Sequence, residues 1–336
     1  MLVCLAVALL SSTSFATACV DEKAQKPIDV KVMVLTLFGM DENTGQPVGE
    51  FKPWYEFYWK DSGQKVDVQE ALHPVYYNQD GVCGTMLGEG KGNAAASLMA
   101  ILVNPNFDFS HAYFIICGCG GVNPQVGTLG CVFIADYIVD YDLYFKWDPE
   151  DGPPPYFQLS PLIEADTHYR LNQDLAQCAM SLAKEIVLVD SPEAEALRRE
   201  FPEEMARKKP FVAIGTHLCS DVFWYGKSDS QLAQRICQKV QAGSFSISDM
   251  ENAALAAVLR RFGYLDRLIA LRHGSDFTQP PPGQTLMEGL KALKEGRSSA
   301  SNICHENGFC VGRGIIQHIL SNWVQWRNGP PEANGQ

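Results

Sequence analysis

The sequence predicts a single α/β domain of three layers, in which a mixed, twisted β-sheet lies between flanking helices. Short, nearly continuous apolar runs alternate with helical segments along the chain, which is typical of strands buried on both faces of a sheet. The composition is that of a globular protein, because 46% of the 336 residues are hydrophobic and 20% are charged. Residues 280–283, Pro-Pro-Pro-Gly, end the core, and a helical C-terminal extension is expected beyond them.

The expected elements follow from the apolar runs and the helix signals. Buried strands are expected at residues 30–38, 81–86, 113–117, 131–138, 210–215 and 268–271. Helices are expected at residues 94–103 and 172–184, and a further helix at residues 248–262. Residues 146–161 are rich in Pro, Gly and Asp, and we expect them to form an excursion from the domain rather than a linker between two domains.

Residues 246–277 form a predicted helix, turn and strand with a carboxylate at each end. Ser248 is expected to cap the helix, with Glu251 three residues later completing a capping box, and Gly263 is expected to end it. The strand then ends near Asp276, and ligands of open α/β sheets gather beyond the carboxyl ends of strands. Glu251 and Asp276 could therefore face one crevice. Each also has a purely structural interpretation, Glu251 as a helix cap and Asp276 as the first residue of a turn.

The charge and the cysteines bear on the class of partner. A formal net charge of -12, with no Lys/Arg-rich run, disfavours binding to nucleic acid. No Cys or His spacing is typical of a zinc site, so no metal is predicted. The 11 cysteines permit disulfides. Cys304 and Cys310, which flank a His-Glu-Asn-Gly segment expected to be a loop, are the best candidate pair.

The N-terminal residues predict export from the cell. Residues 1–10 are mostly apolar and are followed by Ala16-Thr17-Ala18, a pattern typical of a secretory signal peptide cleaved after Ala18. We expect residues 1–18 to be this peptide, residues 19–28 a polar linker and residues 29–336 the α/β domain. No later apolar run approaches the roughly 20 residues of a membrane-spanning helix. The mature chain is therefore expected to be secreted or held at the cell surface, without a transmembrane segment.

Two glycine-rich segments follow predicted strands. Residues 88–93, Gly-Glu-Gly-Lys-Gly-Asn, lead into the helix at residues 94–103 and could present backbone N–H groups to an anion. Their spacing is not that of a P-loop. Residues 118–124 are expected to form a loop that needs either a close backbone approach or a positive φ.

Taken together, these motifs are similar to those of a known family. The segments that carry the resemblance are residues 121–130, Gly-Val-Asn-Pro-Gln-Val-Gly-Thr-Leu-Gly, residues 223–227, Phe-Trp-Tyr-Gly-Lys, and residues 272–277, Arg-His-Gly-Ser-Asp-Phe. With Met250-Glu251, their order resembles the nucleoside phosphorylase/nucleosidase superfamily and, within it, the purine nucleoside permease (NUP) family. The resemblance covers about residues 28 to 330 and implies the same fold class.

The resemblance implies a role for each matching residue. Met250 and Glu251 match the pair that packs on the ribose and accepts hydrogen bonds from its hydroxyls. Asp276 matches the aspartate that hydrogen-bonds or protonates N7 of the purine. Phe223, with Trp224 beside it, matches the aromatic residue that stacks on the base. Cleavage of an N-glycosidic bond suits this set, because Asp276 can donate a proton if burial raises its pKa, while Glu251 stays ionised beside an oxocarbenium-like ribose.

The other matching residues concern the substrate and the nucleophile. Cys119 stands where related enzymes place a serine near the nucleophile, and further substrate contacts are assigned to Ser275, Gly118 and Asn123. Phosphorylases of the superfamily carry arginines for phosphate, and the matching positions here, residues 39–49 and residue 116, supply none. This departure favours water, activated by a glutamate for which Glu50 is the best match and Glu42 its rival. The phosphate or water site is assigned to Gly90, Gly92 and Asn93.

The chain is therefore expected to bind purine nucleosides such as adenosine, guanosine and inosine and to cleave their N-glycosidic bond, as a hydrolase or a phosphorylase. No cofactor is expected, apart from phosphate as a possible co-substrate. The alternative is a non-catalytic nucleoside-binding protein that supports nucleoside transport across a membrane. By resemblance, a homo-oligomer is also possible.

Overall fold

The computed structural model describes residues 26–39, 48–146, 157–158, 166–297 and 299–330. It confirms the predicted fold class, a mixed sheet flanked by helices, with further helices at the C-terminal end. The strands are β1 (Ile28–Asp29), β2 (Val32–Thr36), β3 (Gln64–Val66), β4 (Val75–Tyr77), β5 (Val82–Met86), β6 (Phe107–Asp108), β7 (Tyr113–Val122), β8 (Val132–Asp140), β9 (Phe145–Lys146), β10 (Phe157–Gln158), β11 (His168–Arg170), β12 (Val212–Cys219), β13 (Phe245–Asp249) and β14 (Leu268–Phe277). The helices are α1 (Lys52–Tyr58), α2 (Lys91–Leu102), α3 (Gln173–Ala183), α4 (Pro192–Arg199), α5 (Lys227–Lys239), α6 (Asn252–Arg261), α7 (Leu286–Lys294), α8 (Ser301–Ser321) and α9 (Trp323–Trp326), with a 3-10 turn, η3, at Leu265–Arg267.

Ten of the described strands form one sheet in the order β11-β8-β12-β13-β7-β2-β5-β4-β3, with β14 paired to both β7 and β8. Strands β8, β12, β13, β7 and β14 therefore form a closed circuit, in which β14 runs parallel to β7 and antiparallel to β8. Because β2, β5, β7 and β14 are linked by parallel pairings, their carboxyl ends meet at one edge of the sheet. That edge carries the candidate site described below.

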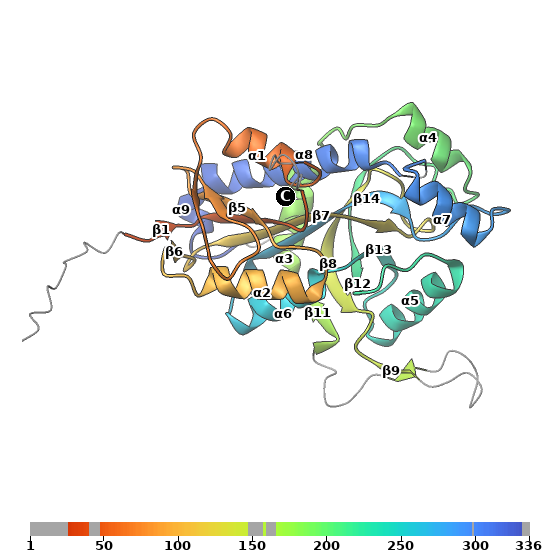
Figure 1. The fold of residues 1–336 in the computed structure, drawn as a ribbon, viewed down its shortest axis with the longest axis horizontal. Helices are drawn as coiled ribbons and strands as arrows, with labels where there is room; N and C mark the ends of the chain where they lie inside the picture. Colours follow the sequence, from red (N-terminus) through yellow and green to blue (C-terminus); the bar gives the residue numbers. More distant parts are fainter. Residues whose placement is uncertain (1–25, 40–47, 147–156, 159–165, 298, 331–336) are drawn as a thin grey trace, which may run out of the picture.

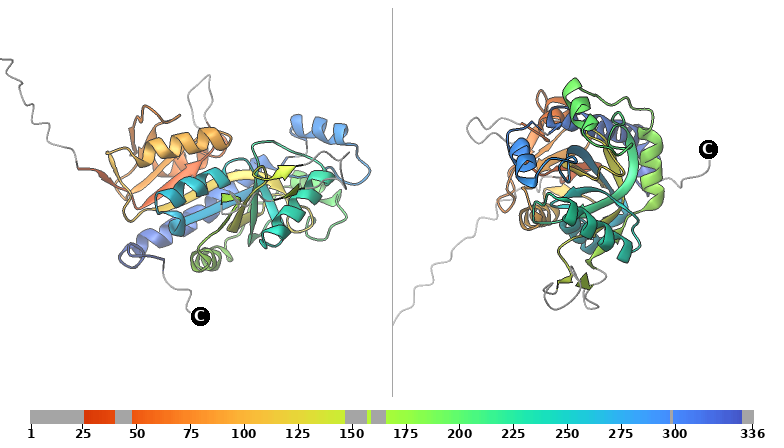
Figure 2. Two further views of the ribbon diagram at one scale, coloured as in Figure 1. Left: turned by 90° about the horizontal axis from the view of Figure 1, so that it is seen from below. Right: turned by 90° about the vertical axis from the view of Figure 1, so that its right-hand side faces the viewer.

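Helices cover both faces of the sheet (Figure 1). On one face, α2 and α6 lie side by side (Figure 2) and bury apolar residues such as Leu98 and Leu255 against the strands. On the other face, α1, α3 and α8 share a second core that includes Trp54, Leu175 and Phe309. The C-terminal helix α8 is thus part of the packed domain, because its apolar side seals one face of the sheet.

The long strand β7 corrects the prediction of a loop at residues 118–124. It runs from Tyr113 to Val122, so Gly118, Gly120 and Gly121 lie within a strand, and none of the three has a positive φ. Glycine is needed here because the backbones of β7 and β13 lie very close together. A Cβ atom at Gly120 would lie 2.5 Å from the backbone oxygen of Ser248. A glycine-rich sequence therefore marks tight strand packing at this position.

The capping box predicted at Ser248 and Glu251 is wrong. Ser248 lies inside β13, and α6 begins at Asn252, with Glu251 at the N-cap position. The cap is supplied by Asp249, whose Oδ1 accepts hydrogen bonds from the backbone N–H groups of Glu251 at 3.0 Å and Asn252 at 2.8 Å. The side chain of Glu251 is therefore available for contacts outside its own helix. Gly263, with a φ of 78°, ends α6 as predicted.

The best candidate pair for a disulfide, Cys304 and Cys310, is not bonded. Both residues are free thiols in α8, and the segment between them is helical rather than a loop. Six residues of helix separate two Cα atoms by roughly 9 Å along the axis, which exceeds the span of a disulfide.

The N-terminal signal peptide at residues 1–18 and most of the linker at residues 19–28 lie outside the described residues and stay predictions.

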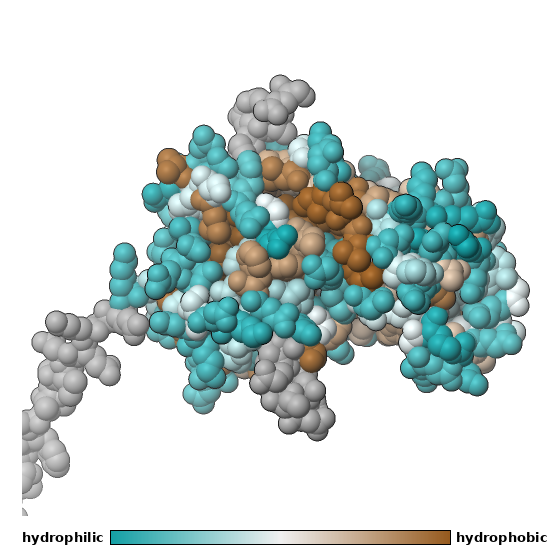
Figure 3. Space-filling view, turned by 90° about the horizontal axis from the view of Figure 1, so that it is seen from above, coloured by the Kyte–Doolittle hydropathy of each residue, from teal (hydrophilic) through white to brown (hydrophobic). Residues whose placement is uncertain are grey.

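None of the described helices combines the length and the hydrophobicity needed to cross a membrane. Apolar side chains gather near the middle of the face seen from above (Figure 3). Phe57 of α1 is 49% exposed. Because apolar atoms make up much of the surface of ordinary monomers, this area does not identify a partner, and the homo-oligomer stays a prediction.

Candidate functional site

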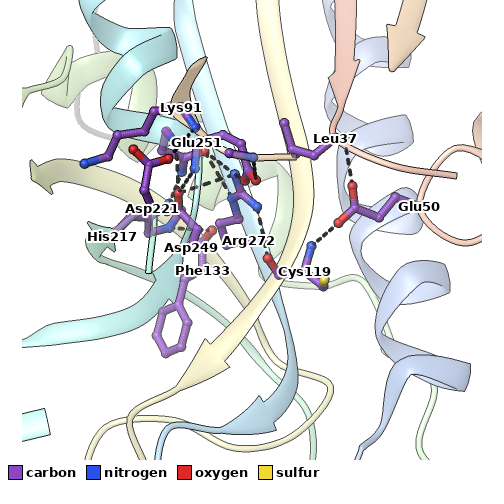
Figure 4. A network of polar contacts seen from close by, with 12 residues as sticks. Leu37, Glu50, Lys91, Cys119, Phe133, His217, Asp221, Asp249, Glu251 and Arg272 are labelled. Atoms are coloured by element: carbon purple, nitrogen blue, oxygen red, sulfur yellow. Dashed lines mark hydrogen bonds and ion pairs between the residues drawn. The ribbon is translucent and has the colours of Figure 1, made fainter. Parts of the chain in front are cut away.

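The buried guanidinium of Arg272 lies at the centre of a polar network at the carboxyl edge of the sheet (Figure 4). Its Nη2 donates to Glu251 Oε2 at 2.9 Å and to Asn252 Oδ1 at 2.7 Å, and its Nη1 donates to the backbone oxygen of Cys119 at 3.0 Å. Burial lowers the pKa of Arg272, but the carboxylates of Asp249 and Glu251 outweigh burial and hold that pKa above its ordinary value. The network therefore contains a fixed positive charge.

A neutral histidine orients Asn252 within this network. The Asn252 side-chain nitrogen lies 2.9 Å from Nδ1 of His217, and Nε2 of His217 lies 3.2 Å from the backbone oxygen of Phe133. Burial lowers the pKa of His217 to about 4. A neutral ring can accept at Nδ1 and donate at Nε2, which turns the oxygen of Asn252 toward Arg272.

Glu251 is buried and held by two donors. Its Oε1 accepts from the backbone N–H of Gly90 at 2.9 Å, and its Oε2 accepts from Arg272. Burial raises the pKa of the Glu251 carboxyl, and Arg272 opposes that rise. The ion pair favours the charged form of Glu251, and each oxygen keeps a lone pair that a ligand hydroxyl could use.

Glu50 lies just before α1 and is 2% exposed. Its Oε2 accepts from the backbone N–H of Leu37 at 3.0 Å, and its Oε1 accepts from that of Cys119 at 2.7 Å. Burial raises the pKa of Glu50 to about 7, although Arg272 and the two N–H donors oppose the rise. Gly118 lies between the two charged groups, since a Cβ atom there would be 2.6 Å from Arg272 Nη1 and 3.1 Å from Glu50 Oε1.

Asp276 stands near the end of β14 in a small pocket. Its Oδ1 accepts from the Ser275 hydroxyl at 2.6 Å, and burial raises the pKa of Asp276 to about 6 against the opposing effect of that hydrogen bond. The pocket is small, with a cavity volume of about 30 Å³, and combines this carboxyl with apolar, aromatic and further polar side chains. Its lining is Gly121, Val222, Phe223, Trp224, Ser248, Asp249, Met250, Asp276 and Thr278.

The N-terminus of α2, predicted as an anion site, is already occupied by carboxylates of the chain. The N–H of Gly90 donates to Glu251, and the N–H of Lys91 donates to Asp221 Oδ1 at 2.7 Å. The amino group of Lys91 pairs with Asp140 at 2.8 Å and with Asp142 at 2.7 Å. An added anion would have to displace these groups. The other two residues assigned to this site are Gly92, whose Cβ position is open, and Asn93, whose amide binds the backbone of Glu89.

The structure brings most of the assigned residues together and sets one apart. Phe223 is 56% exposed at the rim of the Asp276 pocket, whereas Trp224 is buried and stacks on Tyr141. Asn123 does not line this pocket, and its side chain binds the backbone of Phe245 and Gln125. Cys119 takes part through its backbone N–H and oxygen. The alternative glutamate, Glu42, lies outside the described residues.

Several polar residues of the network have no role in the sequence analysis, namely Arg272, Asp249, Asp221, Asn252 and His217. Arg272 was quoted only as part of a motif, and Asp249 and Asp221 were given no contact. A signal for Arg272 was present, because a charged residue inside the apolar run of residues 268–273 must be paired when it is buried. Asp221 gave no such signal, since its partner is the backbone N–H of Lys91, which only the fold brings near. Asp249 did offer a local signal, because an aspartate just before a helix is a favoured N-cap residue.

Comparison with known proteins points to one family. A family model described as "Purine nucleoside permease (NUP)" matches residues 29–331. A protein of Schizosaccharomyces pombe named as a probable purine nucleoside permease is 27% identical over 325 residues, which cover 88% of this chain and 90% of that protein. A purine nucleoside permease of Candida albicans is 29% identical over 265 residues, covering 72% of this chain and 64% of the relative.

The fold is shared with solved nucleosidases. A 5′-methylthioadenosine/S-adenosylhomocysteine nucleosidase of Neisseria meningitidis, bound to methylthio-immucillin-A, matches with a TM-score of 0.52 and 15% identity, over 86% of this chain and 100% of that one. The futalosine hydrolase of Helicobacter pylori matches with a TM-score of 0.53 and 13% identity, over 86% of this chain and 97% of that one. At such low identity the likeness establishes the fold.

Proposed function

The chain belongs to the purine nucleoside permease (NUP) family, and from this premise we propose that it binds purine nucleosides and hydrolyses their N-glycosidic bond. The observation that carries the proposal is the pair Asp276 and Glu251, two carboxyl groups held in different environments at one edge of the sheet. Asp276 has a single hydroxyl donor and a raised pKa, whereas Glu251 is paired with a buried guanidinium. Adenosine, guanosine and inosine are the candidate substrates.

Asp276 acts as the general acid. Its pKa of about 6 leaves a useful protonated fraction near neutral pH. The purine enters the pocket between Phe223 and Met250, with N7 facing the Asp276 carboxyl. The proton moves to N7 as the bond between the base and the ribose breaks, so that the base leaves in a neutral form. An apolar, aromatic lining suits a planar base.

Glu251 stabilises the ribose as positive charge develops on it. The free lone pairs of its carboxylate accept hydrogen bonds from ribose hydroxyls, and Arg272 keeps it ionised. Negative charge placed near an oxocarbenium-like ribose lowers the barrier without needing to move. Met250, which lines the pocket beside Glu251, packs against the sugar.

Water, not phosphate, is the proposed nucleophile. The first N–H groups of α2 bind Glu251 and Asp221, and Lys91 is paired with two aspartates, so no free cationic cradle for phosphate is left there among the described residues. Glu50, with a pKa of about 7, is ionised in a substantial fraction of molecules and takes a proton from the attacking water. The products are the free base and ribose.

A second candidate is favoured by the names of the relatives, which are permeases. In this alternative the protein binds purine nucleosides without cleaving them and hands them to a transport system. The same pocket would hold the nucleoside, and export through the predicted signal peptide would place it outside the membrane. The two candidates differ in one outcome, the release of free base.

Product analysis of the purified protein with adenosine, guanosine and inosine, each with and without phosphate, tests the proposal. We expect release of base and ribose at the same rate in both conditions. Asp276→Asn should lower kcat by about 10²- to 10⁴-fold, the usual contribution of a general acid, and Glu251→Ala should do so as well. Glu70→Gln, at an exposed carboxyl, is the matched control and should keep full activity.

Two results would overturn hydrolysis. Base release that requires phosphate, with ribose 1-phosphate as the product, would make the protein a phosphorylase. Tight binding of nucleoside in an equilibrium assay, without any product in either condition, would leave the binding protein as its function.

A further inference from the structure

A second cluster of chemically reactive side chains lies where β14 passes α8. His273, Cys304 and His305 each offer a ligand atom, and these atoms lie within 4.8 Å of one another. His273 comes from β14, and the other two residues come from the first turn of α8. Because the ligands are 31 residues apart in the chain, with no repeated spacing, the sequence gives no sign of this cluster.

The cluster is buried and incompletely satisfied. Cys304 is fully buried and His273 is 1% exposed. The Nδ1 atom of His273 has no hydrogen-bond partner among the described residues, and leaving a buried polar atom without a partner is unfavourable. The ring is held in place by close packing, since a Cβ atom at Gly308 would lie 2.1 Å from its Cδ2. A bound ligand at this position would account for such a group.

We propose that His273, Cys304 and His305 form a zinc site, with Cys304 binding as a thiolate and each histidine through one ring nitrogen. Imidazole and thiolate are the ligands that zinc prefers, at about 2.0–2.1 Å and 2.3 Å. Tetrahedral geometry then separates sulfur and nitrogen by roughly 3.6 Å, and Cys304 Sγ lies 3.9 Å from Nδ1 of His305. His305 is half-buried and lies next to Cys304 at the start of α8.

The charges around the cluster suit a cation. Burial lowers the pKa of His305 to about 4 and that of His273 well below its ordinary value, so both rings are neutral and have a lone pair for a metal. Burial, then the carboxylates of Glu50 and Asp276, raise the pKa of the Cys304 thiol. A divalent cation would displace the thiol proton of Cys304. The negative charges of Glu50 and Asp276 would stabilise that cation. The positive charge of Arg272 opposes a cation at this position. The same charge contributes to the low pKa of His273.

The proposed metal would join two elements that carry the candidate active site. His273 follows Arg272 and precedes Ser275 and Asp276 on β14, and α8 seals the face behind it. The rings of His273 and His305 are 5.2 Å apart and nearly perpendicular. Zinc would therefore fix β14 against α8. This role does not depend on whether the protein cleaves nucleosides.

Cobalt and zinc titration of the full chain tests the site. Protein stripped of metal with a chelator is titrated with Co²⁺, which shows a thiolate-to-cobalt charge-transfer band when a cysteine binds it. We expect one Co²⁺ per chain with this band, displaced by one Zn²⁺. Cys304→Ser should abolish the band. His305→Asn should weaken zinc binding by more than about tenfold, the effect typical even of residues one step removed from a metal.

Cys310→Ser is the matched control, because Cys310 lies on the same helix but outside the cluster. This variant should keep the band and the affinity. The proposal is overturned if the parent protein shows no thiolate band, or if Cys304→Ser retains it. If Cys304→Ser fails to fold, the test rests on His305→Asn, because the His305 ring is only half-buried and its replacement should be tolerated. Unchanged zinc affinity in His305→Asn would rule the site out.

Discussion

At the residue scale, two buried carboxyl groups, Glu50 and Glu251, and the half-buried carboxyl of Asp276 differ because their hydrogen-bond donors differ. Glu251 has a guanidinium and a backbone N–H, Glu50 has two backbone N–H groups, and Asp276 has one hydroxyl. Burial raises the pKa of each, and each donor lowers it. The carboxyl with the guanidinium partner is the one best kept ionised. Asp276, which accepts only one hydrogen bond and that from a neutral hydroxyl, is the best placed to give up a proton to a substrate.

Ser275→Ala tests this account at Asp276. The change removes the hydroxyl that stabilises the carboxylate, so the pKa of Asp276 should rise above its value of about 6. Because the acid must be protonated to act, the alkaline limb of the pH profile of kcat/KM should move up by about one unit, within the energy of a hydrogen bond to a charged group. Ser181→Ala, at an exposed position of α3, should leave the profile unchanged. An alkaline limb that stays in place or moves down would contradict the role of Ser275.

The sequence singles out Glu251 and Asp276 because they stand in motifs, and the resemblance adds Glu50, with Glu42 as its rival. The fold gathers Glu251, Asp276 and Glu50 at one edge of the sheet, and their catalytic roles stay predictions. Arg272 was not given a role, although it connects Glu251 to β7. Its contacts reach β7, β13 and α6, and pairings of that kind depend on strand order, which local residue patterns do not contain.

At the element scale, β7 shows where local patterns mislead. Glycine runs usually mark turns. Gly118, Gly120 and Gly121 instead lie in a strand, where neighbouring segments pack too closely to leave room for a side chain. The α6 cap is a similar case. A Ser-x-x-Glu pattern was present, but Asp249 supplies the cap. The buried apolar strands and the helix at α3 were predicted well, since their patterns are decided locally.

Two glycine substitutions separate packing from chain flexibility. Gly118→Ala places a methyl group 2.7 Å from Leu37 and 2.6 Å from Arg272. It should lower the free energy of unfolding by about 1–3 kcal/mol, the usual cost of overpacking, and lower kcat/KM as Glu50 and Arg272 are pushed apart.

Gly92→Ala, on α2, is the matched control. The added methyl group meets nothing within 4 Å, so the free energy of unfolding should rise by up to about 1 kcal/mol while kcat/KM stays the same. Urea unfolding and steady-state kinetics measure both variants. Loss of activity in Gly92→Ala would instead support the anion site first assigned to that helix end.

At the scale of the whole molecule, the closed circuit of five strands explains why the site is assembled from distant segments. Glu50, Gly90, Cys119, Glu251 and Arg272 span most of the chain, and they meet because β14 pairs with both β7 and β8. Alternation of strands and helices predicted the class of fold. It could not predict this closure, which depends on long-range pairing.

The buried carboxyls also give the whole protein a pH-dependent stability. The pKa of Glu50 rises from 4.5 to about 7 and that of Asp276 from 3.8 to about 6 on folding. Between roughly pH 4 and 7 these two carboxyl groups bind more protons in the folded than in the unfolded protein, so their contribution to stability falls as pH rises. The buried rings of His217, His273 and His305 act in the opposite sense, because burial lowers the pKa of each. Below that window both states are protonated, and the stabilising effect is fully present. We expect the contribution of Glu50 to the free energy of unfolding to be about 2 kcal/mol smaller at pH 8 than at pH 5, measured without ligand.

Urea unfolding at these two values of pH, with Glu50→Gln beside the parent, measures the effect. Glutamine cannot ionise, so the part of the slope due to Glu50 should disappear, whereas Glu70→Gln at an exposed site should keep the parental slope. Carboxylates with a lowered pKa, such as Asp190 beside Arg198, change their contribution only at lower pH. The buried histidines oppose the trend within this window but are the same in both proteins, so the difference between the parent and Glu50→Gln isolates Glu50. An unchanged slope in Glu50→Gln would mean that Glu50 is already ionised in the folded state and that Arg272 outweighs its burial.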